Sequence, residues 1–388
     1  MSESFFTPIT DIAASVAGGI ADLLGVAPQR LEDPPSTAEV RLPDDLYAKP
    51  DVQTEWWYYT GHCRAVSGRE FGFELVFFKR RSDRDKLAGI PLTLIGNPMY
   101  FAHFAISDIS AGEFRYEHVR SFGRAFDHPA SASAVRCDVR LKDWSLKEVA
   151  GKHVLHATLQ DGLVFDAILD PAKPLVLNGD NGSGIAKKGD GASVHFSYTR
   201  MNVAGTLSER GRSEDFTGTA WMDREFGSWE HGVWDWFSIQ FDDETELMIY
   251  QFRDENGEPG ESTGTYVDAE GKTTYLRRSD FEIENRGFWK SPRNSAVYPA
   301  KWNVRIEKLG IDIDIASLLP DQELDTRGTT MVVYWEGACS VAGRKGESDI
   351  TGRAYVELVG YDMSHREVGI ADFLFGPSLV DLRKRLGV

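Results

Sequence analysis

The segment from Trp221 to Phe237, WMDREFGSWEHGVWDWF, holds four tryptophans and four carboxylates within seventeen residues. Tryptophan offers a large apolar surface and a ring face that attracts cations. A carboxyl group held against such rings binds its proton more tightly, so it can act as an acid near neutral pH. The segment therefore predicts a site at which a protonated carboxyl group meets an apolar substrate.

Hydration of an alkene without a cofactor needs groups of these types. A carboxylic acid must protonate carbon, aromatic faces must stabilise the tertiary cation, and a second carboxylate or a histidine must take the proton that water loses. We predict Asp223 as the acid, because it shares a strand face with Trp221. The other candidate catalytic residues are Glu225, Asp235, Glu55 and, to position water, His103. The candidate substrate-binding residues are Trp57, Tyr59, Trp221, Trp234 and Trp236.

Structural roles for the same residues stay open. Asp223, Arg224 and Glu225 are also compatible with an ion-pair network at a domain junction. Glu55 can pair with Arg80 or Arg200 inside a barrel, because a buried charge usually needs a partner. The tryptophans and His103 are residue types that cores also use.

Other classes of site find little support in the sequence. A metal site from Asp223, Glu225 and His231 matches no standard ligand spacing, so we predict neither a metal nor a cofactor. The sequence also contains no GxSxG, P-loop, GxGxxG or HExxH motif, which disfavours the common hydrolase, kinase, dehydrogenase and zinc protease classes.

Strand periodicity predicts which of these side chains share a face. Side chains alternate between the two faces of a strand, so Trp221 and Asp223 point the same way. Trp234 and Trp236 share a face between Val233 and Phe241, whereas Asp235 falls on the opposite, apolar face. By the same rule Glu55, Trp57 and Tyr59 lie on one face of their strand, and Trp56, Tyr58 and Thr60 lie on the other. Glu74 shares a face with Gly72, Val76 and Phe78. His103 shares a face with Phe101 and Ala105.

The elements that position these residues are predicted to be strands. Short runs rich in Val, Ile, Phe, Tyr, Trp and Thr alternate with Gly, Asp and Asn turns, as in FGFELVFF, MYFAHFAISD and ELMIYQF. The chain has 388 residues, 41% of them hydrophobic, which suits two domains with proper cores. The pattern predicts an all-β protein.

Charge and cysteine content exclude further classes. A formal net charge of -17 disfavours nucleic acid and anionic lipid surfaces as partners, because both would be repelled. Three cysteines lie far apart, so they indicate neither a disulfide framework nor a zinc site. We expect a hydrophobic small molecule or lipid as the partner.

The two ends of the chain differ in character. Apolar residues at helical spacing predict an amphipathic helix over residues 8–25, and a Pro-rich linker then runs to Asp51. The tail 377–388 combines leucines with basic residues, which permits weak peripheral contact with a membrane. No signal peptide and no run of about 20 apolar residues is found, so we expect a cytoplasmic protein, with peripheral contact at the inner face of the membrane as a further option.

The sequence also resembles itself. VAGTLSERGRSEDFTGTAWMD (203–223) aligns with VAGRKGESDITGRAYVE (341–357), which matches Trp221 to Tyr355 and Asp223 to Glu357. A fainter match sets EWWYYTG and FELVFFKR against WDWFSIQ and ELMIYQFR. We infer two similar antiparallel β-domains, each a closed or nearly closed sheet, that join near residues 225–232.

The predicted limits are 1–50 for the helix and linker, 51–228 and 229–376 for the domains, and 377–388 for the tail. The aromatic and acidic segment then lies at the junction, and we expect its first half, through Asp223, to have kept the chemistry.

Several motifs in one order resemble a known family. TEWWYYTGH, FGFELVFFKR, YFAHFAISD, GTAWMDREFG, WDWFSIQFDD, WKSPRNSAVYP, YWEG and YVELVGY are similar to motifs of the carotenoid 1,2-hydratase family, the CrtC/AttH-like group of lipocalin-like proteins, over about residues 51–362. The resemblance implies two packed lipocalin-like β-domains and chemistry on isoprenoid or polyketide-like substrates. Arg224 stands where the family often has histidine, which disfavours a histidine proton shuttle at that position.

Three functions remain open under this resemblance. The first is a lyase, a hydratase that adds water to a double bond of a carotenoid-like isoprenoid. The second is a cyclase of the same fold that acts on a terpenoid or polyketide. The third is a non-catalytic protein that binds a lipid or terpenoid, because one fold can host several functions.

Overall fold

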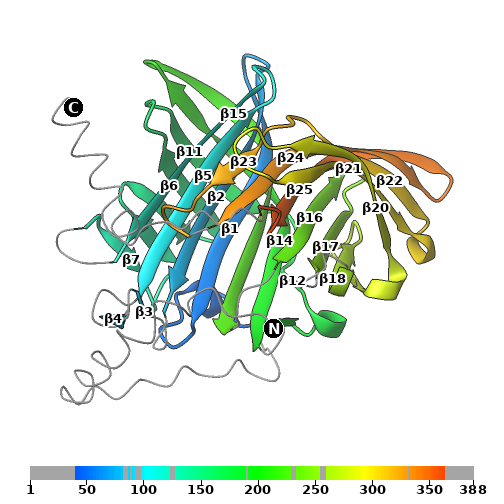
Figure 1. The fold of residues 1–388 in the computed structure, drawn as a ribbon, viewed down its shortest axis with the longest axis horizontal. Helices are drawn as coiled ribbons and strands as arrows, with labels where there is room; N and C mark the ends of the chain where they lie inside the picture. The colour runs from blue at the N-terminus through cyan, green and yellow to red at the C-terminus, as the bar shows by residue number, and fades with distance from the viewer. Residues whose placement is uncertain are drawn as a thin grey trace.

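The computed structural model describes residues 40–81, 86–87, 90–91, 98–122, 127–188, 191–228, 233–253, 259–330 and 332–362. These residues form an all-β protein, as the sequence predicts, with two large antiparallel barrel-like sheets (Figure 1). Within these ranges, none of the helices has the length and apolar character that crossing a lipid bilayer requires.

The first large sheet has thirteen strands in the order β6-β5-β2-β1-β15-β14-β11-β10-β9-β8-β7, with β12 and β13 paired to β14. Its strands are β1 (Thr54–Ala65), β2 (Glu70–Arg80), β5 (Met99–Asp108), β6 (Glu113–Ser121), β7 (Ala130–Ala132), β8 (Asp138–Leu141), β9 (Trp144–Val149), β10 (Lys152–Thr158), β11 (Val164–Pro171), β12 (Val176–Leu177), β13 (Ile185–Lys188), β14 (Gly191–Glu209) and β15 (Arg212–Ser228).

The second large sheet has ten strands in the order β19-β18-β17-β16-β25-β24-β22-β21-β20, with β23 paired to β24. Its strands are β16 (Val233–Phe241), β17 (Glu246–Arg253), β18 (Pro259–Val267), β19 (Thr273–Arg277), β20 (Glu282–Lys290), β21 (Val297–Ile306), β22 (Ile311–Ser317), β23 (Glu323–Asp325), β24 (Val333–Lys345) and β25 (Ser348–Val359). The short β3 (Lys86–Leu87) and β4 (Ile90–Pro91) pair with each other. Four short 3-10 helices complete the described structure: η1 (Asp44–Leu46), η2 (Asp180–Gly182), η3 (Arg278–Asp280) and η4 (Glu307–Leu309).

The two large sheets repeat one strand order, as the internal similarity predicts. The series β5-β2-β1-β15-β14-β11 in the first sheet corresponds to β18-β17-β16-β25-β24-β22 in the second. The pairing register extends this correspondence to single residues. Tyr58 pairs with Asp223 in the first sheet, and Trp236 pairs with Glu357 at the equivalent position of the second. Asp223 and Glu357 are therefore structural equivalents.

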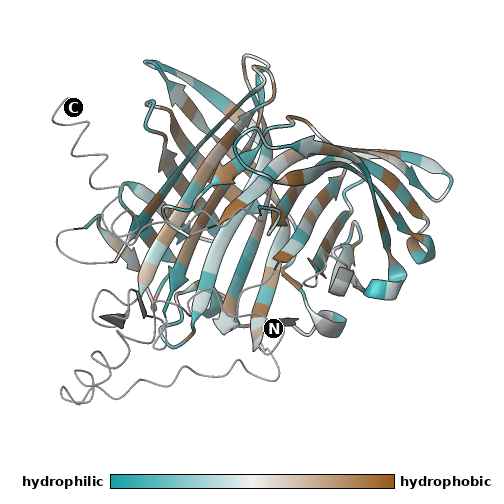
Figure 2. Ribbon diagram, in the orientation of Figure 1, coloured by the Kyte–Doolittle hydropathy of each residue, from teal (hydrophilic) through white to brown (hydrophobic). Residues whose placement is uncertain are grey.

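Each sheet surrounds a core of its own, and alternation along the strands decides which side chains enter it. Residues of one parity in β1, β2 and β15, such as Tyr59, Leu75 and Met222, belong to the first core. Phe237 of β16 and Val356 of β25 belong to the second. The same alternation appears as changes between hydrophobic and hydrophilic colour along many strands (Figure 2).

The outer faces of the two sheets pack against each other. Strands β1 and β2 lie beside β25 and β24, and the residues of opposite parity meet there in two further buried clusters. Tyr58, Trp221, Trp236 and Tyr355 are among the members of the larger cluster. The strands of this contact are therefore covered on both faces.

The predicted terminal segments lie largely outside the described residues. The helix over 8–25 and the tail 377–388 belong to this undescribed part. The end of the predicted linker is described, and there Leu46 of η1 and Ala48 are buried against the first core. This short stretch packs on the sheet because its apolar side chains find a core to enter.

Candidate functional site

Two equivalent rows of side chains face each other between the large sheets. The first row crosses β2, β1, β15 and β14 through Val76, Tyr58, Asp223 and Ser197. The second crosses β17, β16, β25 and β24 through Tyr250, Trp236, Glu357 and Glu336. The two rows run in opposite directions, since Tyr58 of the first contacts Glu336 at the far end of the second.

Each sheet donates a tyrosine hydroxyl to a buried glutamate of the other sheet. Tyr58 Oη donates to Glu336 Oε1 at 2.8 Å, and Tyr334 Oη donates to Glu74 Oε1 at 2.9 Å. Glu74 and Glu336 are each 1% exposed. Glu357 of β25 pairs with Glu336 of the neighbouring strand β24. We call Glu74, Glu336 and Glu357 the acid cluster.

His103 extends one of these contacts. Its Nδ1 atom lies 2.7 Å from the Tyr334 hydroxyl, so Glu74, Tyr334 and His103 form one hydrogen-bonded chain. The tyrosine has one proton to donate, and when it donates to Glu74 the proton between Tyr334 and His103 belongs to Nδ1. Burial, and then His118 nearby, hold the pKa of His103 well below its ordinary value. His103 is therefore a neutral ring at neutral pH.

Burial changes the proton affinity of two members of the acid cluster. It raises the pKa of Glu74 to about 8, against a lowering effect of the Tyr334 hydrogen bond, with a further increase from Glu357. Burial, then Glu357 and Glu74, hold the pKa of Glu336 well above its ordinary value. Glu74 and Glu336 can therefore carry protons at neutral pH, as a carboxylic acid catalyst must.

Aromatic rings surround the acid cluster. Trp236 packs edge-on against Tyr58 with ring centroids 5.3 Å apart, and against Trp221 at 6.1 Å. Trp234 Nε1 donates to Glu357 Oε2 at 2.8 Å. Three of the five predicted substrate-binding residues, Trp221, Trp234 and Trp236, thus lie at this contact, and their ring faces suit a developing carbocation.

Four buried polar atoms around the cluster find no hydrogen-bond partner among the described residues. They are Glu74 Oε2, Glu336 Oε2, His103 Nε2 and Trp236 Nε1. Buried polar atoms in proteins are nearly always bonded to protein, water or ligand. Their concentration at the contact between the sheets therefore marks it as the candidate site.

Asp223 lies in the first row, but its carboxylate is already engaged. Oδ1 accepts hydrogen bonds from the Ser197 hydroxyl and from Trp221 Nε1 at 2.7 Å, and Oδ2 lies 3.0 Å from His195 Nε2. Glu225, on the same face, accepts from the Ser193 hydroxyl. Burial raises the pKa of the Tyr250 phenol, and Glu225, Glu357 and Asp223 raise it further, so both carboxylates face the end of the second row.

Comparison with known proteins assigns the chain to a family. The model of the AttH-like family matches residues 33–361. The chain belongs to this family. The resemblance seen in the sequence is thereby confirmed, and with it the two-domain lipocalin-like fold.

Solved structures share this fold. A Nitrosomonas europaea protein provisionally assigned as AttH is 31% identical, with a TM-score of 0.75 over 86% of this chain and 100% of that one. Kievitone hydratase from Nectria haematococca is 17% identical, with a TM-score of 0.64 over 86% of this chain and 97% of that one. The protein CghA is 12% identical, with a TM-score of 0.50 over 88% and 98%. No curated protein matches the chain.

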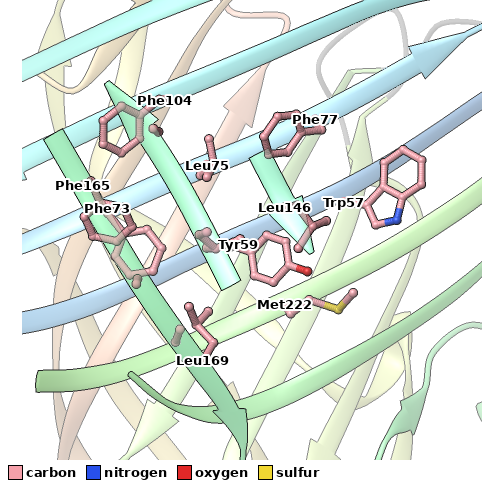
Figure 3. Close-up of a cluster of buried hydrophobic side chains, with 14 of the residues drawn as sticks. Trp57, Tyr59, Phe73, Leu75, Phe77, Phe104, Leu146, Phe165, Leu169 and Met222 are labelled. Carbon is pink, nitrogen blue, oxygen red and sulfur yellow. The ribbon is translucent and has the colours of Figure 1, made fainter. Parts of the chain in front are cut away.

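In this AttH-like chain, three predicted site residues lie inside the first barrel instead. Trp57 and Tyr59 belong to the first core and are fully buried there (Figure 3). Trp57 Nε1 donates to Leu46 O at 2.7 Å, and the Tyr59 hydroxyl lies 2.7 Å from His153 Nδ1. Glu55 shares their face and pairs with Lys79 and Arg224. Their parity along β1 is the reason, because it is Trp56 and Tyr58 that face the second sheet.

The ion-pair network predicted around Arg224 is therefore divided between two faces. Arg224 points into the first barrel, toward Glu55 and over the Trp57 ring, whereas Asp223 and Glu225 point the other way. Arg200 pairs with Glu246 and not with Glu55. His231, the third residue of the metal alternative, lies outside the described residues.

Asp235 lies in the second core, as its parity predicts, and away from the acid cluster. Its carboxylate accepts from the Tyr361 hydroxyl at 3.0 Å and lies 3.2 Å from Arg253 Nε. Burial raises the pKa of Asp235, while Arg253 opposes that effect. We therefore assign it to the fold of the second sheet and not to the candidate site.

Sequence reasoning did not select Tyr58, Glu74, Tyr334, Glu336 or Glu357 as site residues. A signal was present for four of them: Glu74 interrupts an apolar strand, YWEG places Tyr334 and Glu336 on one face, and Glu357 is the repeat partner of Asp223. What the sequence lacked was the contact that joins them, since Tyr334 and Glu74 are 260 positions apart.

Proposed function

We propose that this chain is a cofactor-independent hydratase that adds water to a carbon-carbon double bond of a hydrophobic isoprenoid, with carotenoid-like molecules as one class of substrate. The observation that carries the proposal is the acid cluster of Glu74, Glu336 and Glu357 between two aromatic-lined sheets. Like-charged carboxyl groups at close range do not all ionise, so such a cluster holds both an acid and a base.

Glu74 is the proposed acid. Its Oε1 is engaged by Tyr334, while Oε2 has no bonded partner among the described residues and can face the substrate. The double bond takes the proton from Oε2 through its own electron pair, which forms a C–H bond at one carbon and a tertiary cation at the other. Trp236 and Tyr58 then present aromatic rings to the cation, each worth about 0.5–2 kcal/mol.

Glu357 is the proposed proton acceptor. It accepts the Trp234 hydrogen bond and is half-buried, so it reaches water at the edge of the contact between the sheets. Water attacks the cation, and the proton it loses passes to Glu357. The substrate has then gained one water molecule, and one proton has moved from Glu74 to Glu357.

The fold is compatible with this chemistry, since kievitone hydratase shares it. The test is to incubate the purified chain with prenyl and carotenoid substrates in heavy-oxygen water and to weigh the products. A hydratase yields a product heavier by one labelled water, and Glu74→Gln slows the formation of this product about 10²–10⁴-fold.

Two other outcomes would refute the proposal. A product of unchanged mass would identify a cyclase. Tight retention of a ligand without turnover, in the wild-type chain and in Glu74→Gln alike, would identify a binding protein.

A further inference from the structure

Two of the unpartnered atoms of the site are not used by the proposed hydration. Trp236 Nε1 is a donor, and Glu336 Oε2 belongs to a carboxyl group whose other oxygen is taken by Tyr58. Both residues are almost fully buried. An apolar hydrocarbon offers no bond to either atom.

The two residues that carry these atoms both contact the side chain of Tyr58. Trp236 packs on the Tyr58 ring, and Glu336 accepts the Tyr58 hydroxyl. In the second row they flank Glu357 on the two neighbouring strands, so all three side chains point toward the first sheet. Glu74 is two positions from Val76, the residue paired with Tyr58, which places the proposed acid beside the same group.

Water can satisfy such atoms until an apolar substrate displaces it, and the lost bonds must then be replaced by the substrate. A site that buries hydrogen-bonding groups rejects an analogue that cannot bond them, because the groups are left unpaired. A hydroxyl group matches both atoms, because its oxygen accepts a bond from Trp236 Nε1. It also bonds Glu336 Oε2 in either protonation state, since it accepts from the carboxylic acid and donates to the carboxylate.

We propose that the substrate is an isoprenoid that carries a hydroxyl group close to the reacting double bond, and that Trp236 Nε1 and Glu336 Oε2 bind this group. The inference rests on the proposed function, since it names the substrate class of the same site. It separates terpenoid alcohols and prenylated phenols from pure hydrocarbons such as unmodified carotenes.

The test compares binding of farnesol with that of its deoxygenated hydrocarbon, measured by quenching of tryptophan fluorescence in the wild-type chain. Farnesol is expected to bind about tenfold or more tightly for each hydrogen bond gained. Equal affinity for the two ligands would overturn the inference, and this comparison needs no variant.

Two variants assign the preference to the named atoms. Trp236→Phe removes the indole N–H and keeps an aromatic ring, and Glu336→Met removes both carboxyl oxygens while it keeps the length of the side chain. Each is expected to reduce the preference for farnesol about tenfold while affinity for the hydrocarbon stays within twofold. Trp289→Phe, which removes a half-buried tryptophan packed on the second core, controls for the fluorescence change and should keep the preference. Retention of the preference in both site variants would overturn the assignment.

The result is separable from that of the proposed function. Preference for the alcohol without any hydration would support the inference and refute the hydratase. Hydration of the hydrocarbon as fast as of the alcohol would support the hydratase and refute the inference.

Discussion

Tyr58 of the first sheet donates a hydrogen bond of 2.8 Å to Glu336 of the second, across 278 positions of sequence. The contact has a counterpart of opposite direction, in which Tyr334 of the second sheet donates to Glu74 of the first. Each large sheet thus donates a hydrogen bond to a buried glutamate of the other sheet. Changes at these residues should therefore affect both the activity and the packing of the two sheets against each other.

Removal of the proposed acid is expected to stop hydration without unfolding the chain. Glu74→Gln keeps the size of the side chain and a neutral group, so we expect a fall in kcat of about 10²–10⁴-fold, the usual contribution of a general acid. Product formation under saturating substrate measures it. Glu113→Gln, an exposed position on β6, serves as the control and should retain full activity. Wild-type kcat in Glu74→Gln would remove Glu74 from the mechanism.

Activity is expected to fall as the pH rises through about 8. The acid must be protonated, and burial raises the pKa of Glu74 to about 8, so the active form is lost above that pH. The observed value belongs to the coupled groups Glu74, Glu336 and Glu357 together. Because the Tyr334 hydrogen bond lowers the pKa of Glu74, Tyr334→Phe should move the alkaline limb of the pH-rate profile to higher pH. A shift to lower pH would contradict this arrangement.

The same group makes stability depend on pH. The pKa of Glu74 is about 8 in the folded state against an ordinary 4.5, so between these values the folded chain holds a proton that the unfolded chain has lost. The free energy of unfolding therefore decreases with rising pH in this window, by about 1.4 kcal/mol per pH unit for one proton. Glu74→Gln should remove the contribution of Glu74 to this slope and be more stable than wild type at pH 9, as denaturant titrations at several pH values would measure. An unchanged slope would show that Glu74 titrates normally.

Glu55 is expected to serve stability and not chemistry. Glu55→Gln leaves Lys79 and Arg224 without their anionic partner inside the first barrel, at a cost of about 3–5 kcal/mol in the free energy of unfolding. Glu70→Gln breaks an exposed pair with Arg64 and should cost less than about 1 kcal/mol. Below the denaturation midpoint, the folded Glu55→Gln chain should retain wild-type kcat. A specific loss of kcat would return Glu55 to the candidate catalytic residues.

The sequence predicted the alternation along the strands but not which face forms the site. Along β1 both faces are largely buried, so Tyr58 and Tyr59 look alike in sequence although one meets the second sheet and the other enters the first core. The repeat gave the correspondence of Asp223 with Glu357 because that similarity is local. The engagement of Asp223 by Ser197 and His195 could not be predicted, since it depends on the register of β14 against β15.

The opposite directions of the two equivalent rows have an evolutionary consequence. Two identical copies of such a domain, docked in the same way as a homodimer, would carry the same acidic group twice, once at each end of their shared surface. In the present chain the positions equivalent to Glu336 and Glu357 are Ser197 and Asp223, which bond to each other. Fusion of the copies into one gene allows this divergence, because each end then mutates independently. One end can then specialise in reaction, while the other exchanges its acidic pair for a hydrogen bond within the first sheet.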